Sequence, residues 1–113
     1  MHQLPDIIKS ITLNNKLDES HDLAGMVQES LVTSLKTTNR DVRSRGVKKA
    51  PFVVLIGAAM PSVLAEISFI TNRQELQLLK TAGYKQKIAQ ALHAAVLRYR
   101  SSLKGAAATT VER

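Results

Sequence analysis

Two short apolar runs near the middle of the chain constrain its fold more than any other feature. They are FVVLI, Phe52 to Ile56, and SVLAEISFI, Ser62 to Ile70. Runs of this length, rich in β-branched residues, are typical of strands that are covered on both faces of an α/β sheet. The connection from Gly57 to Pro61 is too short for a parallel crossover, which needs about a dozen residues. The pattern therefore predicts two strands that are antiparallel neighbours or are not adjacent.

Helical periodicity precedes the two runs. Apolar residues recur every four positions, at Leu23, Val27, Leu31 and Leu35. We expect a helix from about Asp22 to Lys36, with Ser20 as its N-cap after the polar break NNKLDES. Asp6 to Ile11 is compatible with a separate short helix.

Helical periodicity also occurs after the two apolar runs. Arg73 to Lys80 is expected to form a short helix, and Tyr84 to Leu103 the longest one, with an apolar face that packs on the sheet. The basic stretch TTNRDVRSRG, which ends at Gly46, is expected to be an exposed loop.

The predicted fold class is α/β, but the set of elements is incomplete. Two strands seldom form a stable sheet alone. Either the chain oligomerises to complete a sheet, or it is the C-terminal portion of a sheet-plus-helices domain, with two strands and about three helices and without the N-terminal strands. We divide it into a linker or short helix at 1–19, a domain portion at 20–104 and a flexible tail at 105–113.

Composition and charge limit the kinds of partner that the chain can bind. The chain has 113 residues, a net charge of +7, no Cys and no Trp, and aromatic residues make up only 4%. Cations are concentrated in residues 36–49 and 80–104, and such segments either bind anionic polymers or are simply solvated. The scarcity of aromatic side chains argues against nucleic acid as a partner. No signal peptide is evident, and no apolar stretch approaches the roughly 20 residues of a membrane span.

Glu66 is the most unusual residue in the apolar runs. Strand alternation places it on one face with Ser62, Leu64 and Ser68. A carboxylate in an apolar sheet must be paired, bound to metal or protonated. A structural ion pair with a basic residue such as Arg45, or a Glu at a strand edge in water, would also account for it.

The order of several motifs resembles one family. Arg45-Gly-Val-Lys48 is followed by the strand that begins at Phe52, by MPSVLAEISFITN from Met60 to Asn72, and by a closing Tyr-x-x-x-Ile-Ala helix from Tyr84. These motifs resemble the C-terminal half of the zinc-dependent type 3 N-acetylmuramoyl-L-alanine amidases. The resemblance covers residues 20 to about 100 and implies a bacterial cell-wall hydrolase that cuts between N-acetylmuramic acid and L-alanine of the stem peptide.

The same resemblance implies roles for particular residues. Glu66 matches the family's catalytic carboxylate, the general base and acid beside a zinc ion that activates water. Arg45 is a candidate for orienting Glu66 or a substrate carboxylate. Asn72 is a further candidate, although a cap for the helix at Arg73 explains it better.

The zinc ligands that the resemblance implies are missing from this chain. They are His, Glu and His in the preceding half of the family domain, and His2, His21 and His93 do not stand in matching contexts. Catalytic zinc needs three protein ligands and an open position. We therefore expect Zn2+ only in a complete enzyme, and we expect the chain alone to be inactive.

Further expectations concern partners and location. The resemblance implies peptidoglycan as substrate and the periplasm or cell envelope as location. Residues 4–20 resemble the segment after an inhibitory helix in some members, which would imply an activating cell-division partner. The alternatives are a non-catalytic module that binds an anionic polymer through its basic segments, and a fragment that self-assembles through an exposed sheet edge.

Overall fold

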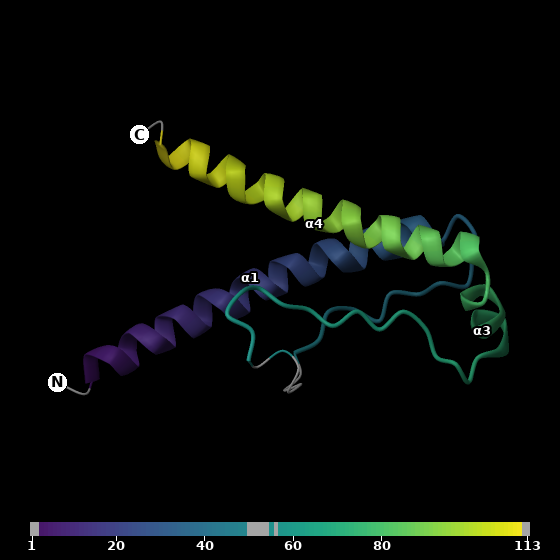
Figure 1. The fold of residues 1–113 in the computed structure, drawn as a ribbon, viewed down its shortest axis with the longest axis horizontal. Coiled ribbons are helices and arrows are strands. Elements are labelled where there is room, and N and C mark those ends of the chain that lie inside the picture. The colour runs from purple at the N-terminus through teal and green to yellow at the C-terminus, as the bar shows by residue number, and fades with distance from the viewer. Residues whose placement is uncertain (1–2, 50–54, 56, 112–113) are drawn as a thin grey trace.

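The computed structural model describes residues 3–49, 55 and 57–111, and these residues form a helical structure (Figure 1). The described helices are α1, Gln3–Leu35; α3, Arg73–Leu79; and α4, Ala82–Val111. α1 and α4 are long rods that cross each other and then splay, so that the start of α1 and the end of α4 point to the same side of the molecule. The hydrophobic core lies where these two helices cross.

The core is formed by one face of each long helix. Its buried residues are Val27, Leu31 and Leu35 from α1 and Tyr84, Ala91 and Ala95 from α4. The α1 residues are four positions apart and therefore share one face of the helix. The two alanines of α4 leave room for close approach, and the Ser30 hydroxyl donates a hydrogen bond to the Ala91 carbonyl at 2.7 Å. The predicted helical stripe on residues 23–35 is thus confirmed as the core-forming face.

α1 is one continuous helix, so the predicted break at NNKLDES and the predicted N-cap at Ser20 are wrong. Pro5 falls in the first turn, where its missing N–H costs no helical hydrogen bond. The Asn and Asp residues of the expected break each lower helix propensity by less than about 1 kcal/mol, and no Gly or Pro accompanies them. The Ser20 hydroxyl instead accepts a hydrogen bond from the Ser62 backbone N–H at 3.0 Å.

The predicted sheet is also wrong, because no strand is present among the described residues. Most of the first expected strand, Phe52 to Ile56, lies outside them, and Leu55, the described residue in that run, is helical. The second run, Ser62 to Ile70, has no ladder partner: the N–H groups at its two ends bind the side chains of Ser20 and Glu75. A strand needs a neighbour to pair with, and two isolated strands are marginally stable at best.

The second run nevertheless keeps the alternation of a strand. Val63, Ala65 and Ile67 are partly buried and pack against the core, whereas Leu64 and Glu66 are exposed. This segment therefore has one face on the helices and one face free. The expectation that both faces of this run are covered is therefore wrong for the described residues, and Phe69, expected on the face of Val63, is exposed.

The C-terminal helices agree with the expected positions. α3 matches the short helix predicted from Arg73, and α4 contains the predicted Tyr84 to Leu103 helix and continues to Val111. Of the helices described, none has the apolar length required to cross a bilayer.

Candidate functional site

Glu66 lies on the exposed face of the extended run from Ser62 to Ile70, which is called the Glu66 segment below. Its side chain is accessible to solvent. No hydrogen bond or ion pair to its carboxylate is formed by the described residues. The expected low-dielectric environment is therefore absent, because the sheet that would enclose Glu66 is absent from the described structure. What the structure presents is a carboxylate on a surface segment without a partner among the described residues.

Arg45 lies close to this segment but does not pair with Glu66. Its guanidinium carbon is 4.6 Å from the centroid of the Phe69 ring, which is a cation–π contact. Arg45 follows Ser44, whose hydroxyl accepts a hydrogen bond from the Gln28 amide of α1 at 2.6 Å. The loop that contains Arg45 is thus connected to α1 on one side and to the Glu66 segment on the other.

The C-terminal end of the Glu66 segment is closed by a set of local hydrogen bonds. The Asn72 N–H donates to the Phe69 carbonyl at 3.0 Å, and the Asn72 side chain accepts from the Glu75 N–H at 3.1 Å. The Glu75 carboxylate accepts from the Phe69 N–H at 3.2 Å. These bonds confirm the prediction that Asn72 caps the helix that begins at Arg73.

Glu75 and Phe69 were not selected from the sequence. The pair Asn72 and Glu75, three residues apart before an apolar helix, is close to a capping box, in which the acidic side chain returns to a backbone N–H before the helix. That spacing could have identified Glu75 from the sequence as part of the helix cap. In this structure the returning bond reaches Phe69, three residues before the cap, and so ties α3 to the Glu66 segment.

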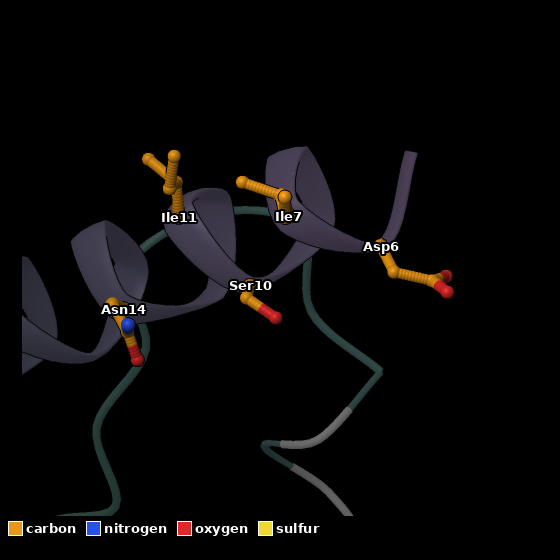
Figure 2. Close-up of a pocket in the computed structure, with 5 residues that line it drawn as sticks. All are labelled: Asp6, Ile7, Ser10, Ile11 and Asn14. Atoms are coloured by element: carbon orange, nitrogen blue, oxygen red, sulfur yellow. The ribbon is translucent and has the colours of Figure 1, made fainter. Parts of the chain in front are cut away.

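The described pockets lie away from Glu66. One is a shallow hollow on the first turns of α1, lined by Asp6, Ile7, Ser10, Ile11 and Asn14 (Figure 2). In that view Ile7 and Ile11 point to one side of the helix, and the side chains of Asp6 and Ser10 point to the other. The second pocket lies between α1 and the loop around Gly46. Neither of these two pockets includes Glu66.

The described residues do not fit the zinc ion that the family resemblance implies. No group of three or more His, Asp or Glu side chains that could hold a metal occurs among them. His21 is on α1 and His93 is on α4, and both are exposed. His2 lies outside the described residues.

The comparison with known proteins places the chain in a family. Residues 8–98 match the model of the family described as N-acetylmuramoyl-L-alanine amidase. The chain is 45% identical over 80 residues to N-acetylmuramoyl-L-alanine amidase LytC of Bacillus subtilis, covering 71% of this chain and 15% of that protein. It is 36% identical over 94 residues to N-acetylmuramoyl-L-alanine amidase AmiA of Escherichia coli, covering 83% of this chain and 29% of that protein.

A third relative and the solved structures complete the comparison. The chain is 44% identical over 75 residues to the uncharacterized protein YqiI of Bacillus subtilis, covering 66% of this chain and 34% of that protein. No solved structure matches the chain significantly. The chain spans about a third or less of the length of these three curated relatives. The match to residues 8–98 nevertheless includes both Arg45 and Glu66, and the chain belongs to the type 3 N-acetylmuramoyl-L-alanine amidase family.

Proposed function

We propose that this chain is part of a peptidoglycan amidase, which hydrolyses the amide bond between N-acetylmuramic acid and the L-alanine of the stem peptide. The observation that carries the proposal is the family match across residues 8–98. Relatives from two bacterial species that bear the name of this activity support it. The substrate is then peptidoglycan, and the site of action is the cell envelope.

In this proposal Glu66 is the general acid and base. Its carboxylate would take a proton from the attacking water and pass that proton to the amine that leaves as the amide C–N bond breaks. Its exposure and its lack of a partner among the described residues support this role, because water and substrate can reach the carboxylate. Such proton transfer typically contributes about 10²- to 10⁴-fold to rate.

Arg45 and Asn72 have supporting roles in the proposal. Asn72 fixes the start of α3, and through Glu75 it fixes the end of the Glu66 segment. Arg45 lies on Phe69, three residues after Glu66, and holds the same segment from the side of the loop. Both act on the placement of the backbone that carries Glu66, and Arg45 also retains donors for a substrate carboxylate.

Zinc dependence and an activating partner remain parts of the proposal. The described residues supply no zinc site, so the ligands would come from other parts of the protein. An activating cell-division partner is proposed only from the resemblance of residues 4–20 to the segment after an inhibitory helix.

A chimera provides the test of activity. The part of Escherichia coli AmiA that precedes its matched segment is joined to residues 8–113 of this chain and incubated with purified peptidoglycan. Mass spectrometry of the products identifies the bond that is cut. We expect stem peptides that begin with free L-alanine and glycan that retains N-acetylmuramic acid. A chimera with native-like helical content that releases no such peptides, under conditions where AmiA does, would contradict the proposal.

A further inference from the structure

The loop after α1 carries a dense and uncompensated positive charge. Residues 36–49 contain six cations and one carboxylate, Asp41, which gives a net charge of +5. All six cations are exposed: Lys36, Arg40, Arg43, Arg45, Lys48 and Lys49. None of them forms an ion pair within the described structure, where the recorded pair is Arg98 with Glu29 on the two long helices. These cations repel one another, and an anion bound to the loop would relieve that repulsion.

Lys87 joins the first helical turns of α4 to this loop. Its ammonium donates hydrogen bonds to the Thr37 hydroxyl at 2.8 Å and to the Thr38 hydroxyl. Both partners are neutral, so the charge of Lys87 is added to that of Lys36 and Arg40 rather than cancelled. The basic surface is defined here as these three cations together with Arg43, Lys48 and Lys49.

The acidic residues of the described chain are concentrated elsewhere. Five of them lie on α1, at Asp6, Asp18, Glu19, Asp22 and Glu29. In Figure 1 the first turns of α1 lie at the end of the molecule opposite the start of α4. Exposed charges more than about 8 Å apart are largely screened at physiological salt. Asp6, on the first turns of α1, therefore does little to offset the charge of Lys87 at the start of α4.

The aromatic side chains indicate which kind of polyanion fits. Binding of single-stranded nucleic acid combines a cationic track with exposed aromatic rings on which bases stack. Tyr84 is buried, Tyr99 is partly buried, and the Phe69 ring is occupied by Arg45. The basic surface thus offers contacts to phosphates, for which arginine is well suited, but no described platform for bases.

We propose that the basic surface binds a phosphodiester polymer without bases, that is, a polyol-phosphate chain. The surface lies on residues other than Glu66, so such binding would hold the protein on an anionic polymer and leave the candidate carboxylate free. The inference depends on charge and exposure and does not depend on the amidase proposal, so either can fail without the other.

The test measures binding of the full chain to fluorescein-labelled poly(glycerol phosphate) at several salt concentrations. If about five phosphates are neutralised, the affinity is expected to fall about 100-fold between 50 and 200 mM salt. The triple variant Lys36→Gln, Arg40→Gln, Arg43→Gln is expected to lower the salt slope by about 2. The matched control is the triple variant Lys9→Gln, Arg100→Gln, Lys104→Gln, which removes the same charge from exposed positions outside the basic surface. It is expected to leave the salt dependence of the affinity nearly unchanged.

Three results would overturn the proposal. The first is binding that is insensitive to salt or absent at 50 mM. The second is an equal loss of affinity in the two triple variants, which would mean that only net charge matters. The third is tighter binding to poly(dT) with the same number of phosphates, which would mean that bases contribute. Circular dichroism of both variants verifies that the helices remain folded.

Discussion

Arg45 lies over the ring of Phe69, with its guanidinium carbon 4.6 Å from the ring centroid, and so links the basic loop to the segment that carries Glu66. The backbone N–H of the same Phe69 donates a hydrogen bond to the carboxylate of Glu75, which lies in α3. Phe69 is therefore the residue at which the loop, the Glu66 segment and α3 meet.

The Arg45–Phe69 contact is expected to have a measurable coupling energy. Exposed cation–π pairs contribute about 0.5 to 1 kcal/mol, so a double-mutant cycle with Arg45→Gln and Phe69→Leu should give a coupling in that range. Urea unfolding monitored by circular dichroism provides the four free energies. Strictly additive effects of the two substitutions would show that the contact does not stabilise the loop.

Truncation of the core is expected to destabilise the crossing of α1 and α4. Leu35 is 3% exposed, and Leu35→Ala should lower the free energy of unfolding by about 2 to 4 kcal/mol through lost burial and a cavity. Leu17→Ala is the matched control, because Leu17 lies on the same helix but is 49% exposed and should cost less than about 1 kcal/mol. Equal costs at the two positions would contradict the observed packing.

Tyr99 makes stability depend on alkaline pH. Burial raises the pKa of the Tyr99 phenol above its usual value of 10.0, and the negative charges of Glu19 and Asp22 raise this pKa further. A raised pKa stabilises the fold below the unfolded value and loses that contribution as pH rises through the folded pKa. The wild-type chain should therefore lose more stability above about pH 10 than Tyr99→Phe does.

At neutral pH the same substitution is expected to be nearly neutral or slightly stabilising. The Tyr99 hydroxyl oxygen is buried and has no hydrogen-bond partner in the described structure, so Phe removes an unsatisfied polar atom. Unfolding free energies of both proteins between pH 7 and 11 test the two statements together. A parallel decline of the two proteins above pH 10 would mean that Tyr99 does not titrate with folding.

The chain should hold little zinc by itself. Catalytic zinc requires three protein ligands, and the described residues contain no such cluster. Elemental analysis of protein purified without a metal-affinity tag and dialysed against a trace of zinc should give far less than one ion per chain. A tightly held ion at about one per chain would reveal a site that includes residues outside the described ranges.

The sequence predicted the helices better than it predicted their connections. The four-residue spacing from Leu23 to Leu35 identified the α1 half of the core, because burial of one helical face depends on local periodicity. The break before Ser20 was predicted from polar residues with only modest helix penalties, and the Ser20 hydroxyl binds the backbone of Ser62 instead. That contact joins residues 42 positions apart and leaves no local sequence signal.

The candidate site was also predicted only in part from the sequence. Alternation along the run grouped Glu66 with Leu64, and both are exposed, but the expectation that both faces of the run are covered was wrong for the described residues. The enclosure of Glu66 in a sheet was wrong for the described residues, because strands depend on partners that local patterns do not specify. The role of Asn72 as a cap was predictable, whereas the stacking of Arg45 on Phe69 was not, because it depends on how the loop folds back.

The role of Glu66 is tested most directly by turnover of peptidoglycan by the AmiA chimera and its Glu66→Gln variant. If Glu66 transfers the proton, the variant should fold with unchanged stability and lose about 10²- to 10⁴-fold in kcat. Glu29→Gln, which removes an exposed carboxylate from the surface pair with Arg98, is the matched control and should keep its activity. A Glu66→Gln chimera that turns over peptidoglycan at the rate of the Glu29→Gln chimera would contradict the proposed role of Glu66.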